Sequence, residues 1–178
     1  MSGDRVNTAM SKSPWGERGF TLIETVIVIA IVALVAILAI PKLPDLLGVK
    51  ASATARKLQS DLAYVQGLSM TTNTRHRLVF LSTTTYEVRD AAGTLVVNPD
   101  GRAGFSIATA SGITLSWSLN GVTVVNRGVE FDTLGRPYLY AGSTPSATNL
   151  TTGTITVTGG GDVQTVTIRD QTGMVSIP

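Results

Sequence analysis

A single carboxylate lies within a long apolar run near the start of the chain. Residues 20–40 read FTLIETVIVIAIVALVAILAI, and Glu24 is their only charge. A carboxylate inside a membrane helix costs several kcal/mol unless it is paired, so it is by default a candidate for function. We therefore expect Glu24 to meet a positive partner. The alternative is that Glu24, close to the start of the run, lies among lipid headgroups and has no role.

Few other residues have the types and spacing that catalysis requires. The only histidine, His76, stands between Arg75 and Arg77 at the start of an expected strand, which favours a surface residue over a catalytic one. Asp132 and Arg136 flank a tight turn and are expected to fix it. No nucleophile motif, metal-ligand spacing, nucleotide loop or dense acidic loop occurs. The sequence predicts a protein that is not an enzyme and holds no cofactor or metal.

The charge pattern says little about nucleic acid. The net charge is +2, and cysteine is absent, which removes disulfides, thiolate zinc sites and cysteine nucleophiles. Binding to DNA needs a cluster of basic side chains on phosphates. The candidates are scattered along the sequence, so they form a patch only if folding gathers them: Arg89, Arg102, Arg127, Arg136 and Arg169.

The apolar run has the length of a membrane span. As a helix, its 21 residues would extend about 31 Å, against a hydrocarbon core of about 30 Å. A buried helix of a soluble protein is seldom apolar on every face over this length. A secretory signal would have a shorter run followed by a small-residue cleavage site. Basic residues stand on both sides of the run, so the positive-inside rule only leans towards a cytoplasmic N-terminus.

A second helix is expected after the run. Pro41 closes the run, where it either bends the helix or ends it, and the next helix is expected to follow Gly48. Small and apolar residues then recur at spacings of three and four over residues 49–72, which predicts a narrow stripe that packs on a sheet. The polar cluster around Asn73 should end this helix. The stripe comprises Ala51, Ala55, Leu58, Leu62, Val65 and Ser69.

From Arg75 onward the pattern changes to short strands separated by turn residues, which favours an antiparallel sheet or a small β-sandwich. Asn120-Gly121 is the best hairpin signal, and Gly159-Gly160-Gly161 predicts a hairpin tip. Gly142–Thr152 is expected to be an exposed loop. The expected strands are Arg77–Leu81, Thr85–Arg89, Thr94–Val97, Gly104–Ala108, Ile113–Ser118, Val122–Val125, Val129–Phe131, Tyr138–Tyr140, Thr154–Thr158, Val163–Arg169 and Met174–Ile177.

The junction between the polar leader and the apolar run carries a resemblance. Arg18-Gly19-Phe20-Thr21-Leu22-Ile23-Glu24 resembles the processing site of type IV prepilins and type II secretion pseudopilins. The resemblance implies that a prepilin peptidase cuts after Gly19 and methylates the new N-terminal amine of Phe20. It implies that Glu24 pairs with this amine on a neighbouring subunit of a filament. It also implies that the long helix bends or locally melts at Pro41.

Later segments of the sequence resemble one group within this family. Phe131-Asp132-Thr133-Leu134-Gly135-Arg136-Pro137 resembles the FD-x-x-GRP segment of the GspH/FimT group of minor pseudopilins. Leu58–Tyr64 is similar to that group's helix before the sheet, and Val163–Ile177 to its last two strands. The resemblance covers nearly all of the chain after Gly19.

The resemblance implies an α+β pilin fold, with a long N-terminal helix packed on an antiparallel β-sheet or small β-sandwich. The expected organisation is a cleaved leader at 1–19, a membrane-spanning half-helix at 20–40, a periplasmic helix continuation at 41–74 and a β-rich head at 75–178. The chain would be held in the bacterial inner membrane with its head in the periplasm, and would then join a filament.

The implied function is that of a structural minor subunit of a type II secretion pseudopilus or a type IV pilus. The implied partners are the prepilin peptidase, other pilin or pseudopilin subunits and inner-membrane lipid. The alternative is a FimT-like minor pilin that binds DNA during uptake, which the scattered arginines disfavour.

Overall fold

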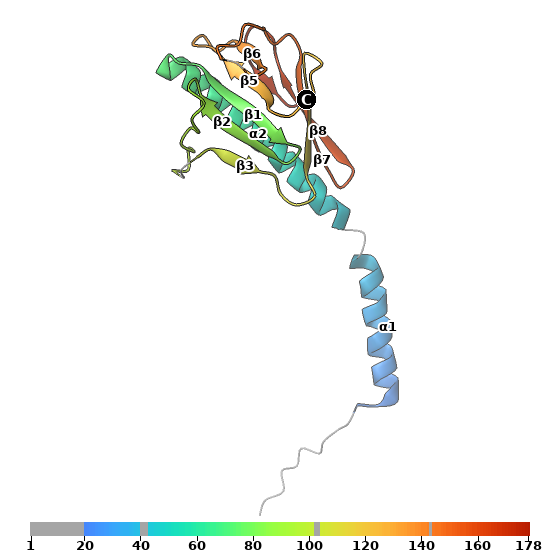
Figure 1. The fold of residues 1–178 in the computed structure, drawn as a ribbon. Helices are drawn as coiled ribbons and strands as arrows, with labels where there is room; N and C mark the ends of the chain where they lie inside the picture. The colour runs from blue at the N-terminus through green and yellow to red at the C-terminus, as the bar shows by residue number, and fades with distance from the viewer. Residues whose placement is uncertain (1–19, 40–42, 102–103, 143) are drawn as a thin grey trace, which may run out of the picture. The chain divides into compact units, whose positions relative to one another are not determined.

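The computed structural model describes residues 20–39, 43–101, 104–142 and 144–178. The chain divides into two units, Met1–Pro41 and Lys42–Pro178. The first contains helix α1, Leu22–Ala39. The second, called the head below, begins with helix α2, Leu43–Thr72, and continues in strands (Figure 1). The expected start of this helix was wrong: Gly48 lies inside α2, because Pro44 in the first turn disrupts no internal helix bond.

The described part of the head contains two antiparallel sheets. The five-stranded sheet has the order β3-β2-β1-β5-β6, and the four-stranded sheet has the order β4-β7-β8-β9. The architecture is therefore α+β, as expected. The strands are β1 His76–Ser82, β2 Thr85–Asp90, β3 Ser106–Ala108, β4 Thr114–Leu119, β5 Arg127–Phe131, β6 Pro137–Tyr140, β7 Gly153–Gly159, β8 Asp162–Ile168 and β9 Val175–Ser176.

One face of α2 forms the centre of the head's core. The expected stripe is confirmed, because all six of its residues are fully buried. The stripe packs on β7 and β8 of one sheet and on β1 of the other, and Figure 1 shows α2 running along these strands. The rings of Phe80 on β1 and Trp117 on β4 stack with centroids 4.5 Å apart and so join the two sheets. Burying this apolar surface is the main force that holds the head together.

Turn residues end the elements where the sequence predicts. Asn73 follows α2 with φ of 53°, the left-handed conformation that commonly terminates a helix. Gly160 and Gly161 join β7 to β8, and both have positive φ, which confirms the hairpin tip. A Cβ added at Gly159 would lie 3.0 Å from the Leu47 carbonyl oxygen. The absence of a side chain there lets the end of β7 approach the start of α2 closely.

Two expected strands are absent from the described residues. Thr94–Val97 follows β2 through hydrogen bonds such as Val96 N to Val88 O at 3.0 Å, but forms no strand of its own. Val122–Val125 forms a single bridge, Leu119 with Val122, after the Asn120-Gly121 turn. The hairpin stops because the chain must cross from β4 in one sheet to β5 in the other.

Two expectations about exposure were wrong. His76 is buried, because strand alternation turns it inward and its backbone N donates to Ser69 Oγ on α2 at 3.1 Å. The loop Gly142–Thr152 is only partly exposed, since Ser146 and Leu150 within it are buried. Both departures arise from contacts between segments that lie far apart in the sequence.

Candidate functional site

The first turn of α1 carries the expected assembly residue, Glu24. Thr21 precedes the helix, and its Oγ1 accepts a hydrogen bond from the Glu24 backbone N at 3.3 Å. The Thr-x-x-Glu spacing is that of a capping box, in which the acidic residue lies beside the free N–H groups of the helix start. Glu24 therefore stands at the positive end of the α1 dipole.

The side chains of α1 are exposed on every face. Phe20 is 81% exposed, and the large apolar residues from Leu22 to Val35 are each at least 50% exposed. Among the described residues, no helix combines the length and apolarity needed to cross a membrane. Gly19, the expected last leader residue, and Pro41, the expected kink, lie outside the described residues. The structure thus places Phe20 and Glu24 together on an exposed, capped helix start.

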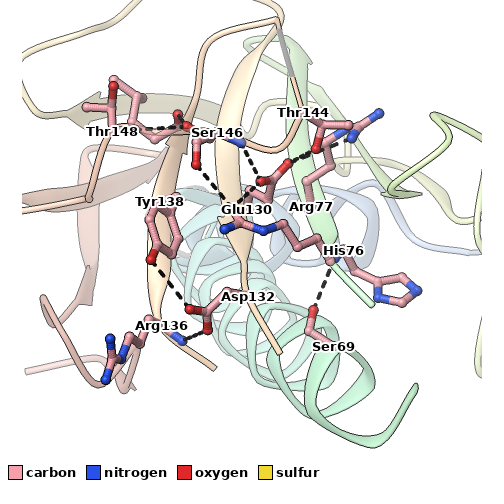
Figure 2. Close-up of polar contacts among 12 residues, drawn as sticks. Ser69, His76, Arg77, Glu130, Asp132, Arg136, Tyr138, Thr144, Ser146 and Thr148 are labelled. Carbon is pink, nitrogen blue, oxygen red and sulfur yellow. Dashed lines mark hydrogen bonds and ion pairs between the residues drawn. The ribbon is translucent and has the colours of Figure 1, made fainter. Parts of the chain in front are cut away.

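A buried carboxylate, Glu130 on β5, anchors a loop of the head (Figure 2). Glu130 is fully buried, and its Oε1 accepts hydrogen bonds from Arg75 Nη1 and from the Ser146 backbone N, each at 2.8 Å. Its Oε2 accepts one from Thr144 Oγ1. The Arg75 guanidinium also lies over the Tyr138 ring, 4.6 Å from its centroid. These bonds hold the loop after β6 against the sheet, and such a buried charge is stable only when paired in this way.

Asp132 fixes the turn between β5 and β6, as expected. Its Oδ1 accepts hydrogen bonds from the backbone N of Leu134 at 2.9 Å and of Arg136 at 2.8 Å. Only the backbone of Arg136 takes part, and its side chain is exposed. Figure 2 shows Asp132 also facing Tyr138, whose hydroxyl donates to Oδ2 at 3.4 Å. The Asp132–Arg136 pair is therefore structural in this fold.

A glutamine on α2 ties this turn to the C-terminal end of the head. Gln66 Nε2 donates to the Gly135 carbonyl at 2.8 Å and to the Thr172 carbonyl at 2.7 Å. About two turns earlier on the same face of the helix, Gln59 Nε2 donates to the Val175 carbonyl of β9 at 3.0 Å. No local sequence signal marks either glutamine, because their partners are far along the chain.

A buried acid on α2 joins the helix to β2. Asp61 is buried, and its Oδ2 accepts a hydrogen bond from the Tyr86 hydroxyl at 2.7 Å. Lys57 pairs with the other oxygen, Oδ1. Burial raises the pKa of the Tyr86 phenol, and the neighbouring Asp61 charge raises it further. Lys57 and Asp61 are four residues apart, a spacing that fits an ion pair on a helix. This spacing is the only local feature of the sequence that points to the contacts of Asp61.

Folding gathers some of the arginines that are scattered in the sequence, an outcome that the sequence left open. Arg89 and Arg127 line one pocket of about 280 Å³ together with Arg77. Arg136 and Arg169 are exposed, and neither lines this pocket. Arg102 lies outside the described residues. The sequence could not reveal this cluster, because it depends on the pairing of β1 with β2 and β5.

The remaining candidate for chemistry is held in a structural role. His76 Nδ1 lies 3.1 Å from the Thr74 carbonyl, and the residue is buried at the end of α2. Among the described residues, no three acidic, histidine or cysteine residues gather into a group that could hold a metal ion. The polar groups described above fix turns and loops of the head.

Comparisons with known proteins concern the N-terminal apolar segment and the head separately. Residues 16–40 match the family described as "Prokaryotic N-terminal methylation motif". A solved structure of the minor pseudopilin EpsH from the type II secretion system of Vibrio cholerae aligns with a TM-score of 0.53 at 9% identity, covering 74% of this chain and 97% of that chain. The type IV minor pilin FimU of Pseudomonas aeruginosa aligns with a TM-score of 0.47 at 16% identity, covering 71% of this chain and 87% of that chain.

None of the curated protein sequences matches the chain at a significant level. At 9% identity, the likeness to EpsH supports only the fold of the head. The motif match is a separate finding about residues 16–40. The chain therefore combines an N-terminal methylation motif at residues 16–40 with a head whose fold resembles that of the minor pseudopilin EpsH.

Proposed function

We propose that the chain is a structural minor subunit of a filament, either a type II secretion pseudopilus or a type IV pilus. The observation that carries the proposal is the methylation motif at residues 16–40, which opens an apolar helix. The head supports it, because its polar groups fix turns and loops while its core closes around α2. A solved protein of similar fold, EpsH, is a minor pseudopilin.

In this proposal the chain is first anchored in the membrane and is assembled into the filament afterwards. The prepilin peptidase removes residues 1–19 by cutting after Gly19, and Phe20 becomes the methylated N-terminus. The apolar residues 20–40 hold the chain in the inner membrane, and the head lies in the periplasm. The exposed position of Phe20 supports this order, since a peptidase must reach the peptide bond before it.

Glu24 then pairs with the Phe20 amine of a neighbouring subunit. Before assembly, the carboxylate lies at the capped start of α1, where free N–H groups and water stabilise its charge. Packing against other helices in a filament removes that water. A carboxylate left unpaired there costs several kcal/mol, whereas a paired one fixes the register between helices.

The experiment measures assembly in a host that supplies a peptidase and partner subunits. Glu24→Ala should be inserted and cleaved like the parent but should crosslink to other pilin-like subunits far less. The matched control is Asp4→Ala, which removes an acidic residue from the leader that cleavage discards. A Glu24→Ala chain that crosslinks as well as the control would contradict the pairing. A parent chain that is cleaved but crosslinks to no such subunit would contradict the proposed function.

A further inference from the structure

Three arginines converge on a pocket at the outer face of the five-stranded sheet, on the side away from α2. The pocket, called the arginine pocket below, has a volume of about 280 Å³. It is lined by Arg77, Val79 and Leu81 of β1, Arg89 of β2, Asn126 and Arg127 at the start of β5, Tyr140 of β6 and Gly142. Three cations around so small a space create a strongly positive concavity.

The nearby carboxylates are engaged by other groups. Glu130 accepts hydrogen bonds from Arg75, Thr144 and the Ser146 backbone, so its two oxygens are occupied. Glu87 Oε2 accepts two from Arg89, through Nε at 3.0 Å and Nη2 at 2.6 Å. Arg89 is thereby paired with Glu87, and Glu130 is shared between Arg75 at 2.8 Å and the more distant Arg77 at 3.8 Å. Arg127 has no ion pair among the described residues.

Arg77 is a buried cation whose hydrogen-bond donors are not satisfied. Only 5% of the residue is exposed, and its Nε and Nη1 make no hydrogen bond within the described residues. Nη1 lies 3.8 Å from Glu130 Oε2, which is an ion-pair distance but too long for a hydrogen bond. The guanidinium is held over the Tyr140 ring at 4.6 Å. A buried donor without an acceptor costs about 1–3 kcal/mol, and more when it is charged.

Arg127 supplies a second cation at the pocket wall. Its Nη1 donates to the Asn126 carbonyl at 3.4 Å, and no ion pair holds it among the described residues. Arg127 is partly exposed, so it can reach an anion that enters from solvent. Two guanidinium groups present the forked donors that match the two oxygens of a carboxylate.

We propose that the arginine pocket binds a carboxylate carried by a partner protein, as an acidic side chain flanked by apolar residues. Val79 and Leu81 in the wall suit the apolar neighbours, and the small volume suits a single side chain. Duplex DNA fits less well, because it needs several phosphate contacts along a surface. The face of Tyr140 is also occupied by Arg77, so it is not free to stack on a base. The inference rests on the head and does not require the proposed filament role.

The test titrates the full chain in uncharged detergent micelles with a capped peptide, Ala-Leu-Glu-Leu-Ala, at about 0.15 M ionic strength. A peptide with Gln in place of Glu and a short duplex DNA are the other probes. The variants are Arg77→Gln and Arg127→Gln, with Arg169→Gln as the control of equal charge change at an exposed site outside the pocket. Trp117 fluorescence reports whether each variant is folded.

The Glu peptide should bind the parent and Arg169→Gln equally, and the Gln peptide should bind about tenfold more weakly. Arg127→Gln should weaken Glu-peptide binding by about tenfold, the effect of one charge-assisted hydrogen bond. Arg77→Gln should do the same, and if it does not fold, Arg127→Gln decides. Equal binding of the two peptides, no effect of Arg127→Gln or no binding at millimolar Glu peptide would overturn the proposal. So would DNA binding that is tighter than peptide binding and lost in Arg127→Gln.

Discussion

Helices α1 and α2 differ in how far their apolar residues are buried. In α2, a narrow stripe of small and apolar residues from Ala51 to Ser69 is fully buried against the head's own strands. In α1, apolar residues occupy every face, and the large ones from Leu22 to Val35 are at least half exposed. The head therefore buries this apolar surface by folding. On the proposed function, the apolar surface of α1 is covered first by lipid and then by neighbouring subunits.

The largest expected effect tests this division directly. Leu62→Ala removes a fully buried side chain from the α2 stripe and should lower the free energy of unfolding of the head by about 2–5 kcal/mol. The matched change in the other helix, Leu34→Ala, affects a residue that is 64% exposed and should leave the head's stability unchanged. Urea unfolding followed by Trp117 fluorescence measures both. Equal losses in the two variants would show that the helices do not differ as described.

The second effect concerns the polar bonds by which α2 holds distant turns. Gln66→Ala removes the donor to the Gly135 and Thr172 carbonyls and should cost about 2 kcal/mol, at about 1 kcal/mol for each hydrogen bond. The control is Gln164→Ala on β8. The Gln164 side chain makes no hydrogen bond among the described residues, so this change should lower the free energy of unfolding much less. The same unfolding measurement compares them. If the two variants are equally stable, the Gln66 contacts contribute nothing to holding the turns.

The third effect is a dependence of stability on alkaline pH. The folded state raises the pKa of Tyr86 through burial and the Asp61 charge, so above about pH 10 the unfolded chain loses this proton while the folded chain keeps it. Deprotonation then favours the unfolded chain, and stability falls by up to about 1.4 kcal/mol per pH unit. Tyr86→Phe should lack this contribution. Urea unfolding between pH 9 and pH 11 tests it, and parallel pH profiles for parent and variant would contradict it.

The sequence predicted best what depends on local periodicity and turn chemistry. Spacings of three and four in α2 fix which residues share a face, so the stripe from Ala51 to Ser69 was predicted in full. Asn73 and the Gly160-Gly161 tip were predicted because few other residues adopt positive φ. The junction at Gly19 and Phe20 was predicted from its own residues and stays a prediction; both residues lie within the motif match at 16–40.

What the sequence did not reveal depends on pairing between distant segments. Arg77 lies opposite Arg89 on β2 and Glu130 on β5, and neither register can be read from one strand alone. The burial of His76 and Ser146 likewise follows from partners elsewhere, at Ser69 and at Glu130. The strand expected at Val122–Val125 failed because local β-propensity does not say that the chain must change sheets there.

On the proposed function, a prepilin peptidase cuts the chain just before α1, between Gly19 and Phe20. Co-expression with a prepilin peptidase, followed by intact-mass measurement, tests it most directly. We expect a chain that has lost its first 19 residues and gained one methyl group on Phe20. A Gly19→Val chain, in which the valine side chain obstructs close approach of the protease, should stay at full length. A chain that is not cut, or whose new N-terminus is any residue other than Phe20, would contradict the claim.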